Sequence, residues 1–177
     1  MTMASEHATA ASAHASANRE QAMTSSAQAA GGEPAMHRKQ AMTAEQAQAL
    51  ALAQATAEAM WARDRAAQAL GMHILDVKPG YAKLAMAVRP DMVNGHHICH
   101  GGMIFTLADT AFAYACNSYN HNTVASACQI DFLAPAKESD TLQAEAVEQV
   151  LAGRSGVYDI TVRTAAGQTV ALFRGKS

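Results

Sequence analysis

The spacing of hydrophobic residues changes from a helical to an alternating pattern at Gly71. Upstream, residues 43–70 are rich in Ala, Gln and Glu, which favour a helix, and Thr43 is a suitable residue to cap its start. Gly71 is a typical stop signal at the end of a helix. Downstream, apolar and polar residues alternate, as expected for strands with one buried face. The pattern therefore predicts a helical segment, residues 43–70, followed by a strand-rich domain, residues 71–177.

The strand-rich domain begins with a predicted hairpin. Residues 73–77 form a short apolar run, Lys78-Pro79-Gly80 is a turn sequence, and residues 81–89 alternate with apolar side chains on one face. Four further strands are expected at residues 123–133, 140–151, 156–164 and 168–174. Because one long apolar helix interrupts these strands, the order predicts an α+β fold, an antiparallel sheet covering a single helix.

That helix is predicted for residues 103–116, where apolar residues occupy nearly every side, so we expect it to be buried. Gly101-Gly102 marks the point where the preceding loop ends and the helix begins. Asp109 is the only residue with a fixed charge between Asp91 and Asp131. Burial disfavours an ionised carboxylate, which makes Asp109 a candidate general base or nucleophile. The alternative is that Asp109 caps a neighbouring backbone.

The residues before this helix indicate a site for a developing negative charge. A helix N-terminus presents unpaired N–H groups and a partial positive charge, and a glycine such as Gly101 allows close approach of a ligand oxygen. Asn94 and His100 add side-chain donors near the same end, and Asn94-Gly95 predicts a turn that folds the loop back. An oxyanion site and an acid on one helix suggest attack on a carbonyl.

Several short segments give the chain a recognisable pattern: Asn94-Gly95-His96, His100-Gly101-Gly102, Leu107-Ala108-Asp109-Thr110-Ala111, Ile130-Asp131-Phe132-Leu133 and Ala171-Leu172-Phe173-Arg174-Gly175-Lys176-Ser177. Together they closely resemble the hotdog-fold acyl-CoA thioesterases of phenylacetate degradation. The resemblance covers about residues 60–177 and implies a hotdog fold, in which an antiparallel β-sheet wraps around one long central helix. An HGG sequence followed by Asp eight residues after its first glycine is fairly specific for this branch.

The resemblance also implies roles for individual residues. Asn94, His100 and Gly101 would surround the thioester carbonyl, and Asp109 would drive hydrolysis. The implied substrate is an acyl-CoA, such as phenylacetyl-CoA or a ring-hydroxylated relative, and no cofactor is expected because coenzyme A is part of the substrate. Further candidate contacts with the substrate are Gly102, Thr110, Ser126, Arg174, Lys176 and Lys137, the three basic residues being candidates for the phosphates. For these three the alternative is a solvated surface charge; for Thr110 it is a bond to its own helix, and for Ser126 it is packing.

Helix geometry predicts that one chain cannot form a complete site. Gly101 and Asp109 are eight residues apart, so at about 1.5 Å per residue they lie roughly 12 Å apart along the helix axis. One thioester carbon cannot lie within the roughly 3 Å that both roles require. Two antiparallel helices related by a two-fold axis would bring Gly101 of one chain opposite Asp109 of the other. We therefore expect a homodimer with shared sites, and the resemblance implies a homotetramer.

Composition limits the remaining possibilities. The 177 residues carry a formal net charge of −2 and no basic stripe, so nucleic acid is not an expected partner. No run approaches the roughly 20 apolar residues of a membrane span, so no membrane association is expected. The three cysteines, Cys99, Cys116 and Cys128, show no paired spacing, which favours a reducing cytoplasm. Residues 1–42 are rich in Ala, Ser, Thr and Gln and are predicted to be a disordered low-complexity extension.

Other interpretations remain open from the residues alone. A hotdog dehydratase would use a loop histidine and a helix acid, for which His100 and Asp109 are candidates, whereas an acyl-CoA sensing module would be non-catalytic. His96, His97, Cys99 and His100 lie within five residues, but this span is too short for a typical tetrahedral site, so no metal is expected. Cys116 is predicted to be a buried packing thiol. Asp131 is predicted to form structural hydrogen bonds at a sheet end.

Overall fold

The computed structural model describes residues 42–177, so the predicted extension, apart from Met42, lies outside the described residues. The elements in chain order are α1 (Ala44–Trp61), α2 (Arg65–Ala69), β1 (Met72–Lys78), β2 (Tyr81–Ala87), the short 3₁₀ helix η1 (Pro90–Met92), α3 (Gly101–Asn117), β3 (Ala127–Phe132), β4 (Thr141–Ala152), β5 (Ser155–Thr164) and β6 (Thr169–Lys176). Within the described part of the chain, no helix combines the length and apolar character needed to cross a membrane.

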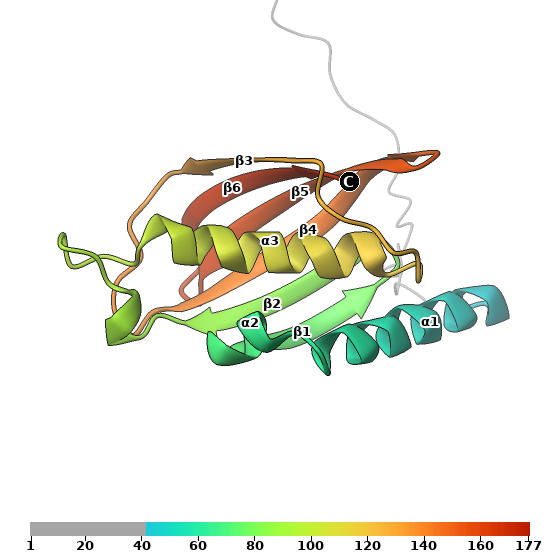
Figure 1. Cartoon of the computed structure of the whole chain (residues 1–177), viewed down its shortest axis with the longest axis horizontal. Helices are drawn as coiled ribbons and strands as arrows, with labels where there is room; N and C mark the ends of the chain where they lie inside the picture. Colours follow the sequence, from blue (N-terminus) through green and yellow to red (C-terminus); the bar gives the residue numbers. More distant parts are fainter. Residues whose placement is uncertain (1–41) are drawn as a thin grey trace, which may run out of the picture. The chain divides into compact units, whose positions relative to one another are not determined.

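The six strands form one antiparallel sheet in the order β1-β2-β4-β5-β6-β3. The sheet curves around α3, which lies across its concave face, while α1 runs beside β1 (Figure 1). This arrangement confirms the predicted α+β class and hotdog fold. Strands β1 and β3 form the two edges, so β3 has one side without a strand partner among the described residues.

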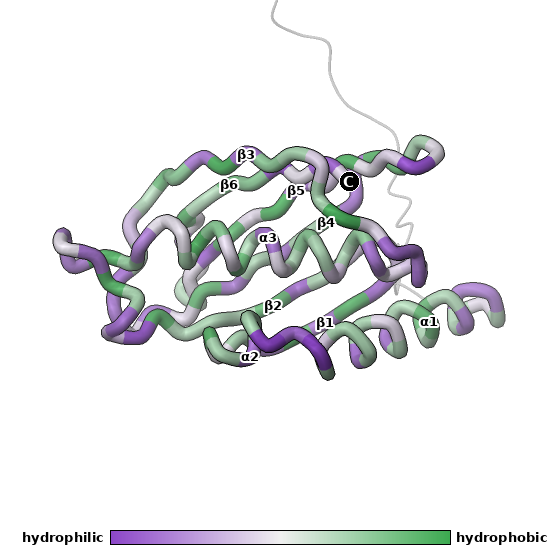
Figure 2. Tube along the Cα trace, viewed as in Figure 1, coloured by the Kyte–Doolittle hydropathy of each residue, from purple (hydrophilic) through white to green (hydrophobic). Residues whose placement is uncertain are grey.

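One side of α3 packs closely against the sheet. Leu107, Ala108 and Ala111 are completely buried, and hydrophobic segments of the strands lie around the same helix (Figure 2). Opposite them, Gly175 of β6 has no side chain, and the ring of Phe112 fills that space: a Cβ at Gly175 would lie 2.9 Å from three ring atoms. Burial of these apolar surfaces supplies the main driving force that holds the helix in the sheet.

The helical segment predicted over residues 43–70 is helical but not continuous. It is divided into α1 and α2. Thr43 caps α1 as expected: its hydroxyl accepts a hydrogen bond from the N–H of Gln46, and the Gln46 side chain accepts one from the N–H of Thr43. The chain then turns after Trp61, and the Asp64 carboxylate caps α2 by accepting from the N–H of Ala67. Tyr114 of α3 donates to the other Asp64 oxygen at 3.3 Å. Asp64 thus both caps α2 and joins the turn between the two helices to α3.

Most strand boundaries agree with the predictions to within two residues, but the strand expected at residues 123–133 begins later, at Ala127. The amide of Asn117, at the end of α3, donates to the carbonyl of Thr123 at 2.9 Å and accepts from its N–H at 3.0 Å. These bonds hold Thr123 against the helix end, and the backbone bonds to β6 begin only at Ser126, whose N–H donates to the carbonyl of Lys176 at 2.8 Å.

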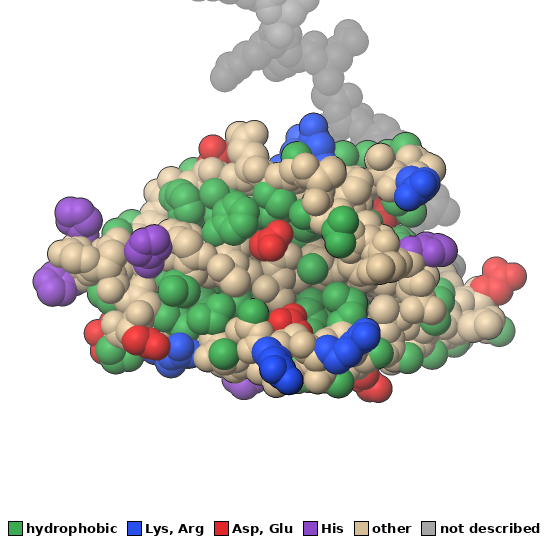
Figure 3. Space-filling model, in the orientation of Figure 1, with side chains coloured by type: hydrophobic (Ala, Val, Ile, Leu, Met, Phe, Trp, Pro, Cys, Tyr) green, Lys and Arg blue, Asp and Glu red, His purple; other side chains and the backbone are tan. Residues whose placement is uncertain are grey.

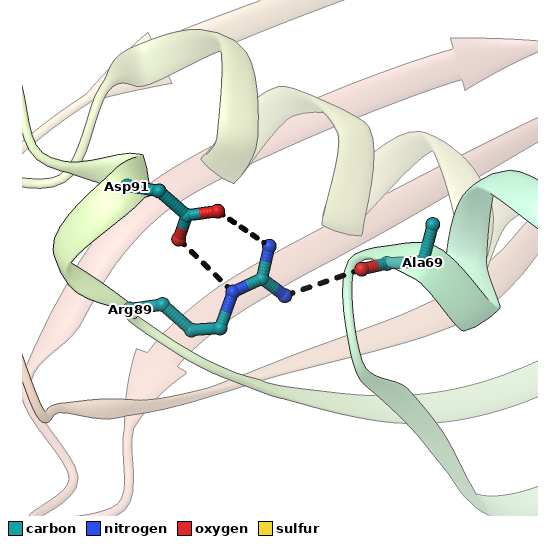
Figure 4. A network of polar contacts seen from close by, with 3 residues as sticks. All are labelled: Ala69, Arg89 and Asp91. Atoms are coloured by element: carbon teal, nitrogen blue, oxygen red, sulfur yellow. Dashed lines mark hydrogen bonds and ion pairs between the residues drawn. The ribbon is translucent and has the colours of Figure 1, made fainter.

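Arg89 is the predicted end of the second strand, but it lies outside β2. Its side chain joins the end of α2 to η1 (Figure 4). Its guanidinium donates to both carboxylate oxygens of Asp91 at 3.0 Å and to the carbonyl of Ala69 at 3.3 Å. The neighbouring cation holds the pKa of Asp91 below its usual value. These contacts connect the end of α2 to η1, where the loop leading to α3 begins.

We predict that Gly175→Ala destabilises the fold because the added methyl group would meet the Phe112 ring at 2.9 Å. The free energy of unfolding should fall by about 1–3 kcal/mol in urea denaturation, and a second substitution, Phe112→Leu, should restore part of it. Gly95→Ala is the control because no atom lies within 4 Å of its Cβ position. Equal stability of the two alanine variants would contradict this packing argument.

Candidate active site

The N-terminus of α3 is capped by the side chain that precedes it. His100 adopts an extended backbone, and its Nδ1 accepts a hydrogen bond from the N–H of Gly102 at 2.9 Å. A neutral imidazole that accepts through Nδ1 carries its proton on Nε2, so Nε2–H is the donor available to a ligand. The N–H of Gly102 is already used by this cap, whereas the N–H of Gly101 has no hydrogen-bond partner among the described residues.

Gly101 is also in contact with a residue that the sequence analysis did not assign to the site. A Cβ at Gly101 would lie 3.0 Å from the Phe132 ring of β3. Phe132 remains 53% exposed, so this aromatic ring borders the unpaired Gly101 N–H on an open face. Phe132 belongs to Ile130-Asp131-Phe132-Leu133, one of the segments that carry the family resemblance. Its contact with Gly101 is visible only in the tertiary structure.

Asn94 organises the loop before α3. Its side-chain oxygen accepts from the N–H of His96 at 2.9 Å, and its backbone N–H donates to the carbonyl of Ile98 at 2.9 Å. The predicted turn is therefore present, and His97 within it adopts a positive φ of 59°. The amide nitrogen of the Asn94 side chain has no hydrogen-bond partner among residues 42–177, so it is a donor available at the loop.

Asp109 lies at the middle of α3 and is partly buried. Burial raises the pKa of its carboxyl above the usual value, and a hydrogen bond from the thiol of Cys128 on β3, with Sγ 3.8 Å from Oδ1, acts in the opposite direction. Among the side-chain hydrogen bonds of the described chain, this carboxylate accepts only from the Cys128 thiol and from no backbone N–H, so the alternative of a backbone cap is wrong. Because burial disfavours the charged form, this carboxylate binds a proton more readily than an exposed aspartate does. Such proton affinity is a property of a general base.

The expectation that α3 is buried on nearly every side is wrong for the single chain. The sheet covers one side, and the opposite side shows hydrophobic and acidic side chains together on an open face (Figure 3). A stripe along this helix is partly or fully exposed, and it comprises Gly102, Thr106, Asp109, Thr110, Ala113 and Asn117. Asp109 therefore faces outwards towards whatever covers the open side of α3.

Two of the predicted substrate contacts have local partners. Thr110 donates to the carbonyl of Thr106 at 2.7 Å, one turn earlier in α3, which is the alternative considered for it. Ser126 donates to the carbonyl of Lys176 at 3.1 Å and closes the start of β3. Both hydroxyl protons are thus used within the fold, while both oxygens remain potential acceptors.

Arg174 and Lys176, predicted as candidate contacts for the coenzyme A phosphates, do not lie on the face of the sheet covered by α3, which carries Asp109, because side chains alternate along the strand. Phe173 and Gly175 of β6 face α3, so Arg174 and Lys176 project from the other face of the sheet. The Arg174 guanidinium also pairs with Asp159, with nitrogen to oxygen distances of 2.6 and 2.7 Å. This cation holds the pKa of Asp159 below its usual value.

Lys137 lies nearer the N-terminal end of α3. Its own N–H donates to Asp140 at 2.7 Å, and the carbonyl of the adjacent Ala136 accepts from the N–H of Cys99 at 2.8 Å. These bonds hold the exposed Lys137 beside the loop that enters α3. Of the three predicted basic residues, Lys137 is the one whose neighbour in the chain, Ala136, bonds to the loop before Gly101.

The remaining polar candidates take other places. Burial raises the pKa of the Cys116 thiol to about 11, in agreement with the predicted packing role. Asp131 is exposed on β3, on the same face of the sheet as Asp159 and Arg174, and its carboxylate does not make the structural hydrogen bonds predicted for it within residues 42–177. Across this described range, no three His, Cys, Asp or Glu side chains converge as metal ligands would.

Comparison with known proteins identifies the family. Residues 96–171 match the model of the thioesterase superfamily. The chain is 52% identical over 121 residues to the acyl-coenzyme A thioesterase PaaI of Escherichia coli, covering 68% of this chain and 86% of that relative. A solved structure of the E. coli PaaI protein from the phenylacetic acid degradation operon matches with a TM-score of 0.70 and 50% identity, covering 71% of this chain and 91% of that one. A Streptococcus mutans protein bound to acetyl-CoA matches with a TM-score of 0.58 and 25% identity, covering 59% of this chain and 85% of that one.

The curved antiparallel sheet around one central helix, together with these matches, defines a hotdog thioesterase fold. The chain belongs to the thioesterase superfamily and is a thioester hydrolase. The family match favours the thioesterase over the dehydratase and the sensing module. The geometry agrees, because Nδ1 of His100, the histidine that the dehydratase alternative would use, is held by the helix cap.

We predict that Asp109→Asn increases stability at neutral pH. Burial raises the pKa of the Asp109 carboxyl in the folded chain, so its ionised form is favoured by unfolding, and its destabilising effect appears as the pH rises above the unfolded pKa of about 3.9. The melting temperature of the variant should exceed that of the parent at pH 7, and the two should converge below about pH 4. A lower melting temperature for Asp109→Asn at pH 7 would contradict this environment.

Proposed function

We propose that this thioester hydrolase acts on acyl-CoA, with phenylacetyl-CoA or a ring-hydroxylated relative as substrate. The observation that carries the proposal is the arrangement on α3: an unpaired Gly101 N–H at its start and a partly buried Asp109 at its middle. The name of the E. coli relative and the acetyl-CoA bound to the S. mutans protein support the acyl-CoA class. The link of the E. coli protein to phenylacetic acid degradation supports the aryl-acetyl group.

In the proposed reaction, the thioester carbonyl oxygen accepts a hydrogen bond from the Gly101 N–H. The positive end of α3 stabilises the charge that develops on this oxygen. The side-chain amide of Asn94 and the Nε2–H of His100 are further donors at the same end of the helix. Gly102 contributes by donating its N–H to His100, which fixes the orientation of the ring.

Asp109 supplies the attack on the carbonyl carbon by one of two routes. As a general base it takes a proton from water, whose oxygen forms the new bond to the acyl carbon. As a nucleophile it forms an anhydride that water then cleaves. In both routes the bond between the acyl carbon and sulfur breaks, and the products are a free acid and coenzyme A. Neither route requires a cofactor, since coenzyme A arrives as part of the substrate.

The proposed site uses two chains. Within one helix, Gly101 and Asp109 are separated by roughly 12 Å along the axis, and the exposed stripe of α3 presents Asp109 to a neighbour. The edge of β3 is also open beside it in the described chain. A second copy of α3, antiparallel to the first, would bring its Gly101 opposite Asp109. We propose this homodimer, assembled further into a homotetramer as the resemblance implies.

The proposal extends to the surroundings of the enzyme. Lys137, beside the N-terminal end of α3, is the basic residue that we propose for the coenzyme A phosphates. Cys99, Cys116 and Cys128 are all free thiols, which supports a reducing cytoplasm as the location.

We predict that Asp109→Asn lowers turnover of phenylacetyl-CoA by at least roughly a hundredfold, because the base or nucleophile is removed. KM should change little, since the amide occupies the same space. Release of the coenzyme A thiol, followed across a panel of acyl-CoAs, measures both the loss and the preferred acyl group. Asp131→Asn, an exposed acid on β3, is the matched control and should keep parental turnover. Near-normal turnover of Asp109→Asn would refute the assignment.

Subunit exchange tests the shared site. One inactive parent is Asp109→Asn, and the other combines Gly101→Val, which blocks the carbonyl position, with Phe132→Ala, which makes room because Phe132 contacts Gly101. Mixed dimers contain one site with both defects and one with neither, so activity should return towards half of normal per dimer. Verified exchange with activity no higher than that of the parents would show that each chain forms its own site.

A further inference from the structure

The register of β3 places one thiol beside the proposed catalytic acid. Cys128 pairs with Gly175 of β6, which in turn pairs with Tyr158 of β5. Gly175 and Tyr158 lie on the face of the sheet that α3 covers, where Phe112 packs against Gly175. Cys128 therefore points towards the helix, and its Sγ lies 3.8 Å from Oδ1 of Asp109.

The Cys128 thiol is the one hydrogen-bond donor to the Asp109 carboxylate within the described chain. The thiol is exposed together with the acid on the open side of α3, unlike Cys99 and Cys116, which are buried. The pairing of Cys128 with Gly175 holds its backbone in β3, so its Cβ stays on the face of the sheet that α3 covers.

We propose that Cys128 is a positioning residue for thioester hydrolysis: its S–H donates to Oδ1 of Asp109 and thereby leaves Oδ2 directed to the reacting water or acyl carbon. This inference rests on the proposed function, since it acts through Asp109. A thiol is a weaker donor than a hydroxyl. It therefore fixes the orientation of the carboxylate while stabilising the negative charge less than Ser would, and Asp109 keeps more of its basicity.

Within the described residues of one chain, two titratable side chains lie near Asp109. Cys128 approaches from β3, and its own pKa is raised by burial and by the nearby Asp109 charge. Cys116 lies two turns further along α3, and its pKa is likewise raised by burial, with a smaller contribution from Asp109. Both are thiols that remain neutral near pH 7, so the two neighbours do not change charge while Asp109 titrates.

The first test compares Cys128→Ser and Cys128→Val, which are similar in size but differ in donating ability. Cys128→Val should lower kcat roughly five- to tenfold with KM unchanged within about twofold, whereas Cys128→Ser should stay within about threefold of the parent. The low-pH limb of the kcat profile reports ionisation of Asp109. Its midpoint should move to higher pH in Cys128→Val, where the stabilising donor is lost, and to lower pH in Cys128→Ser.

Gln129→Ala is the matched control, because Gln129 is the next residue of β3 and belongs to the other face of the sheet. It should keep both the parental kcat and the parental pH profile. A Cys128→Val enzyme with parental kcat and pH profile would overturn the positioning role. Equal losses in Cys128→Val and Cys128→Ser, with no opposite shifts of the low-pH limb, would also overturn it by indicating packing alone.

A second measurement tests the contact without using activity. The infrared S–H stretching band of Cys128 is obtained as the difference between the spectra of the parent and Cys128→Ser. If the thiol donates to the Asp109 carboxylate, this band should shift to higher frequency in an Asp109→Asn background, where the acceptor is neutral and weaker. An unchanged band would refute the contact.

The two measurements separate the positioning proposal from the proposed function. If Asp109→Asn keeps its turnover of acyl-CoA but shifts the S–H band, the proposed function fails and the contact stands. If Asp109→Asn loses turnover while Cys128→Val matches the parent, the proposed function stands and the role of Cys128 fails.

Discussion

The close packing of α3 against the curved sheet is the constraint on which the site depends. Phe112 fits only because Gly175 has no side chain, so the helix lies at a depth set by direct contact of ring and backbone. At this depth β3 reaches two positions of the helix: Phe132 contacts Gly101, and Cys128 contacts Asp109. A change of helix depth would therefore alter the surroundings of Gly101 and of Asp109 together.

Asp109 differs electrostatically from the paired acids of the same chain. Asp91 and Asp159 each accept two hydrogen bonds from an arginine, and those cations lower their pKa values. Asp109 has a thiol as its only donor within the described residues, and burial raises its pKa. The two paired acids each join a loop or a strand to an arginine, whereas Asp109 has no cationic partner among the described residues.

The helical segment before the sheet, α1 and α2, is hydrogen-bonded to other parts of the fold. Asp64, at the turn between α1 and α2, accepts a hydrogen bond from Tyr114 near the end of α3. Arg89 connects the end of α2 to η1, from which the chain continues to Asn94 and the start of α3. The helical segment thus contacts α3 directly at Tyr114, whereas at the other end it reaches only η1, where the Met92 carbonyl accepts a hydrogen bond from the N–H of His100 at 2.8 Å.

The sequence by itself determined the order of helix and strands and singled out Gly101 and Asp109, because hydrophobic periodicity, glycine signals and an isolated charge are local properties of the chain. The tertiary structure decided the contact of Asp64 with Tyr114, the outward direction of Arg174 and the position of Cys128 against the acid. Each of these depends on strand register or on a partner distant in sequence. Since a shift of one residue moves a strand side chain to the opposite face of the sheet, local patterns cannot determine which side chains meet at the site.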